Sequence, residues 1–262
     1  MAKVYEQIAE DFRRAIRTGE LSPGDRLPTE TALVEKYGKT LPTIRQALGL
    51  LQSEGLIEKR HGRGSFVRKP RKVVRRTNER HQWEKNRARE DHSERVKTGA
   101  TEHDTGLQVD DLVFHAHYRE VEANSDLAAV FGVPEGTTLV ERNYRTRYRA
   151  EDAPFNMVTS YLVRDYVAAN PDLLDDTKEP WPGGTMNQLD TVGIELGSIE
   201  ERVTARPPTA EETDELKLLP GTSVLIVRKI SRDIDGRPVE VSDLVLPGDR
   251  TEMTFITPLE RW

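Results

Sequence analysis

Three arginines alternate along one short segment, and arginine side chains are well suited to binding anions. Arg145, Arg147 and Arg149 lie in residues 139–149, which are predicted to form a strand. Successive side chains of a strand point to opposite faces, so these three residues share one face. A guanidinium fork matches the geometry of a carboxylate or a phosphate. The pattern therefore predicts a site for a small anion, and a solvated edge strand is the alternative interpretation.

Polar side chains also gather at the start of a helix that is predicted to begin after Thr40. Four apolar residues form the inner stripe of that helix: Ile44, Ala47, Leu48 and Leu51. Thr43, Arg45 and Gln46 remain on the outer side, near the N-terminal end. A polar helix end of this kind can enter the major groove of DNA, where arginine pairs with guanine or phosphate and glutamine pairs with adenine.

Two more helices must support that helix, and the preceding residues predict both of them. Apolar residues recur every four positions at Val4, Ile8, Phe12 and Ile16. This spacing predicts a helix over residues 4–18. Thr29 is placed to cap a second helix, which Gly38 ends.

A glycine-rich hairpin is predicted to follow the three helices. Residues 56–60 and 65–68 form its two strands, and His61-Gly62-Arg63-Gly64 forms its tip. Three helices and a hairpin make a winged helix-turn-helix. The tip is thin enough to lie along the minor groove of DNA.

The composition excludes several other kinds of site. The 262 residues include no cysteine, which removes disulfides, thiolate nucleophiles and cysteine-ligated metals. His115 and His117 share one face of a predicted strand, but no third ligand is evident, so we expect no metal site. Motifs for serine hydrolases, phosphate-binding loops and dinucleotides do not occur. We therefore expect neither an enzyme nor a cofactor.

Hydropathy and charge indicate where the protein acts and how it is divided. No run of about 18 apolar residues occurs, and no apolar signal core follows the first residues, so we expect a cytoplasmic protein. Residues 1–70 carry 13 Lys and Arg against 9 Asp and Glu, and residues 71–98 carry 10 against 5. Residues 99–262 carry 16 against 31. The basic front and the acidic remainder predict two modules with different partners.

The acidic part has the pattern of an α+β domain around an antiparallel sheet. Strands are predicted over residues 112–121, 139–149, 155–163, 199–205, 223–234 and 237–245, with a further edge strand at 253–256. Short helices are predicted over residues 125–131, 186–192 and 209–216. Residues 133–142 and 219–228 repeat one turn–strand pattern, and two such copies can enclose a central cleft for a small ligand.

The highly charged segment that joins the two modules is predicted to be a solvated linker, extended or partly helical. Additional phosphate contacts by its arginines are the alternative interpretation. Trp83 is expected to dock on the second domain. The predicted domains are residues 1–69, a basic linker over 70–104 and a second domain over 105–262.

Five motifs occur in order within residues 3–68. They are residues 21–30, Tyr37-Gly38, residues 43–48, residues 55–57 and residues 61–66. Together they resemble the DNA-binding domain of GntR-family transcription regulators. The resemblance implies DNA contacts by Arg26, Thr29, Glu30, Arg45, His61, Gly62, Arg63 and Gly64. The predicted set also includes Thr40, Thr43 and Gln46. Leu41 stands where the family commonly has an arginine, so the operator is expected to differ from the family consensus.

Residues 105–258 resemble the UTRA ligand-sensing domain of the HutC subfamily, which has a chorismate-lyase-like fold. This resemblance implies a homodimer that responds to an effector, with Arg145, Arg147, Ser160 and Glu240 lining the pocket. Val158 and Leu246 replace a glutamate and an aromatic residue of the family pattern. A less polar ligand than a sugar phosphate, such as an organic acid, is therefore expected.

These observations predict a transcription regulator, most simply a repressor. Its winged helices would bind an inverted repeat in double-stranded DNA, and a small anionic effector, a carboxylate or a phosphate, would modulate that binding. Two alternatives remain at this point. One is an architectural or plasmid-maintenance DNA binder without a ligand, and the other is an enzyme related to chorismate lyase.

Overall fold

The chain forms two compact units in a computed structural model that describes residues 3–260. One unit contains residues up to 72 together with residues 207–223. The other contains residues 73–206 and the residues from 224 onward. The outermost limits of the predicted domains, residues 1 and 262, lie outside the described residues.

The first unit is a winged helix-turn-helix, as predicted. Its helices are α1 (Val4–Thr18), α2 (Glu30–Tyr37) and α3 (Leu41–Ser53), and its hairpin consists of β1 (Ile57–Arg60) and β2 (Gly64–Val67). Thr29 caps α2, because its hydroxyl oxygen accepts a hydrogen bond from the backbone N–H of Ala32 at 3.2 Å. The short helix α10 (Ala210–Glu215) belongs to the same unit.

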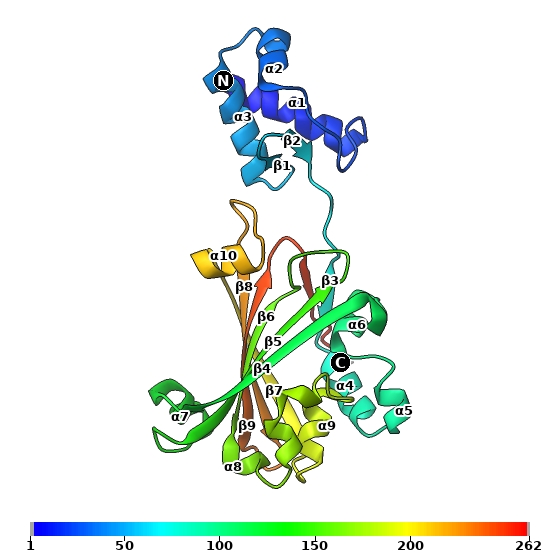
Figure 1. Cartoon of the computed structure of the whole chain (residues 1–262), viewed down its shortest axis with the longest axis vertical. Coiled ribbons are helices and arrows are strands. Elements are labelled where there is room, and N and C mark those ends of the chain that lie inside the picture. The colour runs from blue at the N-terminus through cyan, green and yellow to red at the C-terminus, as the bar shows by residue number, and fades with distance from the viewer. Residues whose placement is uncertain (1–2, 261–262) are drawn as a thin grey trace. The chain divides into compact units, whose positions relative to one another are not determined.

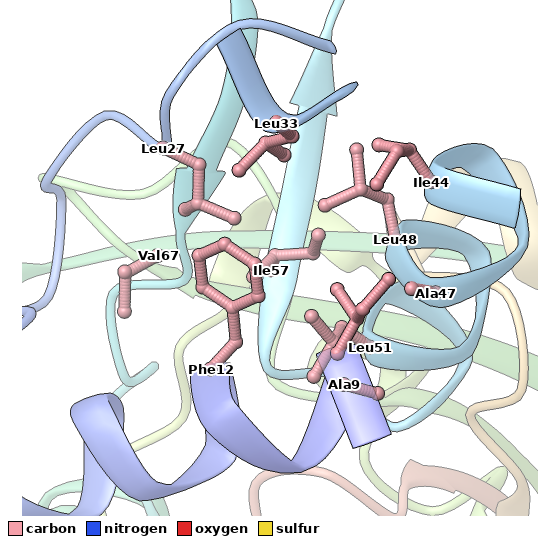
Figure 2. Close-up of a cluster of buried hydrophobic side chains, with 11 residues drawn as sticks. Ala9, Phe12, Leu27, Leu33, Ile44, Ala47, Leu48, Leu51, Ile57 and Val67 are labelled. Carbon is pink, nitrogen blue, oxygen red and sulfur yellow. The ribbon is translucent and has the colours of Figure 1, made fainter. Parts of the chain in front are cut away.

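One apolar cluster joins the elements of this winged helix. Figure 2 shows Phe12 of α1, Leu51 of α3 and Ile57 of β1 converging on its centre. Ile44, Ala47, Leu48 and Leu51 are all buried, as the predicted stripe requires. The cluster fixes the inner side of α3, so the polar residues of that helix face away from the core.

The second unit is built on one six-stranded antiparallel sheet (Figure 1). The strand order is β4-β5-β6-β9-β8-β7. The strands are β4 (Leu112–Glu122), β5 (Thr138–Tyr148), β6 (Met157–Val163), β7 (Leu196–Arg206), β8 (Val224–Asp233) and β9 (Pro238–Pro247). The two hairpins β5–β6 and β8–β9 are neighbours through the β6–β9 pairing, which aligns Ser160 with Ser242.

Short helices pack on this sheet and bury its apolar residues. They are α7 (Ser125–Phe131), α8 (Arg164–Val167), α9 (Gly184–Asp190) and the 3-10 helix η2 (Pro171–Leu174), whereas the 3-10 helices η1 (Val109–Asp111) and η3 (Asp176–Lys178) contain no buried residue. Phe131 of α7 packs with Leu139 and Val241 of the sheet. Leu189 of α9 packs with Leu162 and Val239 in a second cluster.

The segment after residue 72 is an ordered part of the second unit, which differs from the predicted solvated linker. It forms β3 (Val74–Thr77), α4 (Arg80–Ala88), α5 (His92–Arg95) and α6 (Ala100–Thr105). Arg76, Arg80 and Arg87 are buried in it. Acidic partners make this possible for Arg76 and Arg80, because a charged side chain is costly to bury unless it is paired. Trp83 stacks on His103 of the same segment, with ring centroids 4.1 Å apart.

Strand β10 (Thr251–Thr254) also differs from its prediction as an edge of the main sheet. It pairs in parallel with β3, and Thr251 lies opposite Val74. The ordered segment supplies β10 with a different partner, so the predicted edge strand lies in a separate two-stranded sheet.

Candidate functional site

The outer side of α3 presents Arg45 in an exposed ion pair. Arg45 Nε donates to Glu30 Oε2 at 2.8 Å, and Lys59 Nζ lies 3.6 Å from the other oxygen of Glu30. The hydrogen bond from Arg45 lowers the pKa of Glu30 below its usual value. Since 61% of the Arg45 side chain is exposed, its charge is accessible to a phosphate or a base edge.

The other predicted contact residues of α3 lie around this pair. The hydroxyls of Thr40 and Thr43 are hydrogen-bonded to each other at 3.0 Å. Thr40 is the N-cap residue of α3, but its side chain caps no backbone N–H. Gln46 is exposed, and Leu41 is 37% exposed at the first position of the helix. Polar groups and one apolar side chain are thus available on the same helix end.

The hairpin tip is exposed as well. His61, Gly62 and Arg63 are exposed, and Gly62 and Gly64 have φ values of 70° and 108°. Arg26 lies next to the hairpin, where its backbone bridges Phe66. A Cβ added to Gly64 would lie 3.3 Å from Nε of Arg26. The glycines therefore allow a thin tip and a close approach of Arg26.

A cavity of about 400 Å³ opens in the second unit. Ser160 and Glu240, both predicted to contact the effector, line this cavity. The hydroxyl of Ser160 donates to Glu240 Oε1 at 2.8 Å, so the structure brings these two residues together. Strands β6 and β9 position them, because the two strands are adjacent in the sheet.

Glu240 is the centre of a buried charged cluster beneath the cavity. Arg142 Nη2 donates to it at 3.1 Å, and Lys229 Nζ lies 2.9 Å from its other oxygen. Ser231 donates to it at 2.9 Å. Burial alone would raise the pKa of Glu240, but the charges of Lys229 and Arg142 lower it to about 2. Glu240 is therefore an anion at neutral pH, and its charge is already balanced.

Arg145 and Arg147 do not line the cavity, in contrast to the sequence prediction. The cavity-lining residues of β5 are Tyr144 and Thr146. The side chains of the strand alternate, so the odd-numbered arginines point to the other face. Arg145 donates to the carbonyl oxygens of Tyr144 and Val158, and Arg147 donates to that of Glu151.

Sequence reasoning missed Arg142, Tyr144 and Glu179 around the cavity. Arg142 is fully buried, and its Nη1 donates to Gln188 at 2.8 Å. Tyr144 donates to Glu179 Oε1 at 3.1 Å. Arg142 and Tyr144 are two residues apart on β5 and share one face, but polar residues occur on both faces of this strand, so their spacing alone gave no signal. Glu179 lies in a proline-rich stretch that carried no pattern.

Apolar residues form much of the remaining lining. They include Leu112, Phe114, Phe155, Val158, Trp181, Met186, Leu196 and Leu244. Val158, which departs from the family pattern, lies in the lining itself, whereas Leu246 is buried in a neighbouring apolar cluster. The cavity therefore combines an apolar body with a few charged groups, as small-molecule sites commonly do.

The fold and the two sites define a class of protein, one in which a DNA-binding winged helix is joined to a domain with a ligand cavity. The profile of bacterial regulatory proteins of the gntR family matches residues 4–67, and that of the UTRA domain matches residues 115–252. The chain belongs to the GntR family of transcription regulators that carry a UTRA domain. This confirms the predicted family and the predicted α+β fold class.

Known relatives agree with this assignment along nearly the whole chain. The uncharacterized HTH-type transcriptional regulator SCO4628 of Streptomyces coelicolor is 29% identical, over 97% of this chain and 92% of its own. The HTH-type transcriptional repressor NagR of Bacillus subtilis is 25% identical, over 98% of this chain and 95% of its own. The crystal structure of PhnF from Mycobacterium smegmatis shares the fold with a TM-score of 0.54 at 18% identity, over 96% of this chain and 99% of that one.

The family and these relatives are transcriptional regulators and not enzymes, so the regulator interpretation is confirmed over a chorismate-lyase-like enzyme. The winged helix implies DNA as a partner, and the UTRA domain implies a small-molecule effector. Within residues 3–260, no helix has the length and apolarity needed to span a membrane.

Proposed function

We propose that this protein is a homodimeric repressor that binds an inverted-repeat operator and responds to a small anionic effector. Each winged helix would read one half-site, because helix-turn-helix dimers bind half-sites that are related by the symmetry of the protein. It acts in the cytoplasm, where its DNA partner is found. The observation that carries the proposal is the exposed Arg45 on a rigid helix, in the same chain as a 400 Å³ cavity.

The DNA contacts proposed for α3 are made by Arg45, Gln46, Thr40 and Thr43. Arg45 and Gln46 are exposed on adjacent positions, and the buried stripe of α3 holds their backbone in place. Thr29 at the start of α2, together with Arg26 and the tip residues 61–64, adds contacts to the sugar-phosphate backbone and the minor groove, and Glu30 acts on DNA binding through Arg45, to which it is hydrogen-bonded. Exposed residues of this kind position the protein without reorganising its core.

The effector is proposed to bind in the cavity of the second unit, above Ser160 and Glu240. Binding there can change operator affinity only if the effector has different affinities for the DNA-bound and DNA-free states. NagR is described as a repressor, which supports repression as the proposed outcome for this chain.

The test is a selection of bound sequences from random duplex DNA with the full chain at a stated salt concentration. A motif with two inverted half-sites, together with a dimer by light scattering, supports the proposal. Small carboxylates and sugar phosphates are then screened for release of the selected duplex. Binding that shows no motif and vanishes smoothly with salt overturns it, since such binding is nonspecific.

A further inference from the structure

One wall of the cavity is formed by residues that neither family profile includes. The profiles match residues 4–67 and 115–252, whereas Val74, Arg76, Arg80, Glu84 and Arg87 of the intervening segment line the cavity. We call residues 73–106 the connector. Its β3 and α4 thus help to determine which ligand the cavity accepts.

Most charges of the connector wall are already neutralised by nearby carboxylates. Arg80 Nη1 donates to Asp104 at 2.6 Å, and Arg80 Nη2 donates to Glu84 at 2.9 Å. Arg76 Nη2 donates to Glu201 at 3.2 Å. Because each of these cations has an acidic partner at hydrogen-bond distance, none of them needs an anionic ligand.

Arg87, at the end of α4, differs from the other cations of this wall. It is 5% exposed and lines the cavity, yet no carboxylate of the described residues lies within 4 Å of it. Its Nη1 donates to the carbonyl oxygen of Arg95 at 2.7 Å, and its Nε has no hydrogen-bond partner among the described residues. Its guanidinium carbon lies 5.3 Å from the ring centroid of Trp83. Burial lowers the pKa of Arg87, although the more distant Glu84, Glu102 and Glu90 act in the opposite direction.

We propose that Arg87 binds the carboxylate of a monoanionic effector whose body is apolar. This inference rests on the proposed function and names the chemical class of its effector. A guanidinium edge that lacks partners can donate two parallel hydrogen bonds to a carboxylate. The apolar part of the ligand would then contact side chains such as Phe114, Phe155 and Trp181, which line the same cavity.

The charge balance of the cavity favours a carboxylate over a phosphate. Arg87 supplies one cation without an ion pair, whereas Glu179 also lines the cavity and would repel a second negative charge. Glu179 accepts hydrogen bonds from the neutral groups of Tyr144 and Gln188, so its own charge has no cationic partner within 4 Å in the described part of the chain.

The experiment titrates the full chain with pairs of acids and amides of the same shape, without DNA. The pairs are benzoate and benzamide, phenylacetate and phenylacetamide, and 4-methylpentanoate and 4-methylpentanamide. Calorimetry measures the affinity, and tryptophan fluorescence reports on Trp83 and Trp181. At least one carboxylate is expected to bind about tenfold more tightly than its amide, which corresponds to a charged hydrogen bond.

Two variants with the same change of charge locate this preference. Arg87→Gln is expected to lower the affinity for the carboxylate about tenfold, so that the carboxylate no longer binds more tightly than its amide. Arg89→Gln is the matched control, because Arg89 is 59% exposed, pairs with Glu195 and does not line the cavity. The affinity of this control variant for the carboxylate should remain within about twofold of that of the unchanged protein.

The proposal is overturned if no carboxylate binds better than its amide, or if Arg87→Gln keeps the preference. The first outcome needs no variant, so a failure of Arg87→Gln to fold leaves the test decisive. Failure of the DNA selection together with a clear carboxylate preference would reject the proposed regulation and keep this ligand site. The reverse result would keep the regulation and reject this site.

Discussion

Arg45 and Arg142 each form an ion pair with a glutamate, but the two pairs lie in opposite environments. Arg45 lies 2.8 Å from Glu30, and 61% of its side chain is exposed. Arg142 lies 3.1 Å from Glu240 and is fully buried. An exposed pair contributes about 0–1 kcal/mol, whereas breaking a buried pair costs about 3–5 kcal/mol. Arg45 can therefore exchange its partner for DNA, while Arg142 is held in the fold.

The comparison also explains why counting arginines does not locate an anion site. The second unit is acidic overall, yet it contains several buried arginines, and most of them are paired within the protein. An arginine is available to a ligand only when it is exposed, as Arg45 is, or buried without an acidic partner, as Arg87 is. Exposure or the absence of an acidic partner, more than residue type, distinguishes the proposed binding arginines from the structural ones.

The largest expected effect follows from breaking the buried pair. Glu240→Gln should lower the free energy of unfolding of the second unit by about 3–5 kcal/mol at pH 7, because it leaves Arg142 and Lys229 uncompensated. Glu200→Gln is the control, since Glu200 pairs with Arg202 at the surface. Urea denaturation followed by tryptophan fluorescence measures both variants. Equal effects of the two substitutions would contradict the comparison.

Comparing the unchanged protein with Glu240→Gln also predicts how stability depends on pH. The pKa of Glu240 is lowered from 4.5 to about 2 in the folded state, so its stabilising contribution is present above pH 4.5 and is lost as the pH falls toward 2. The difference in stability between the unchanged protein and Glu240→Gln should therefore shrink between pH 4.5 and pH 2. A constant difference over this range would show that the charge of Glu240 is not its source.

Breaking the exposed Arg45–Glu30 pair by removing Arg45 should weaken DNA binding and leave stability nearly unchanged. Arg45→Ala is expected to weaken operator binding by roughly 5- to 150-fold, the range for one specific side-chain contact to a base. The melting temperature should hardly move, because surface substitutions are usually within about 0.5 kcal/mol. Arg202→Ala is the matched control, since Arg202 is 64% exposed on β7. Mobility-shift titrations that show no loss for Arg45→Ala would overturn its proposed role.

A smaller effect is expected where Thr29 supports the helix that carries Glu30. Thr29→Ala should destabilise the winged helix by about 1 kcal/mol, because the N–H of Ala32 loses its side-chain acceptor. Thr29→Ser keeps the hydroxyl and should remain close to the unchanged protein. Far-UV circular dichroism during thermal unfolding measures the difference. Equal losses in both variants would point to the methyl group instead of the cap.

The smallest effect tests whether Glu30 competes with phosphate for Arg45. Glu30→Gln should raise the affinity for random duplex DNA about threefold at low salt, and the gain should disappear at high salt because screening weakens surface charges. Glu54→Gln removes an equal charge from the same unit, where Glu54 pairs with Arg13 instead. Fluorescence anisotropy at two salt concentrations measures both. A similar gain in affinity for both variants would show that the gain comes from the change in net charge and not from the release of Arg45.

The sequence predicted the elements whose signals are local. The four-residue spacing in α1, the cap at Thr29 and the glycine that ends each of the first two helices all depend on neighbours within one or two turns. The connector has no such signal, because Arg76 is paired with Glu201, far away in the chain. Its charged composition alone therefore resembles that of a solvated linker.

The candidate site was only partly predictable for a related reason. Ser160 and Glu240 were anticipated from the family resemblance and lie together, but the face of β5 was assigned to the odd-numbered arginines. Both faces of that strand carry polar residues, so alternation alone does not distinguish the cavity side. The choice depends on Gln188 and Glu240, which approach Arg142 from other elements.

The parallel pairing of β3 with β10 has a consequence for the order in which a newly made chain acquires its properties. Arg75 and Glu252, on these two strands, are 177 positions apart. The core of the winged helix lies within residues 8–67 and can form once that stretch has left the ribosome. At about 5–20 residues per second, β10 follows roughly 10 to 35 seconds after β3. The β3–β10 sheet beside the cavity therefore forms only after the core of the winged helix can already have folded.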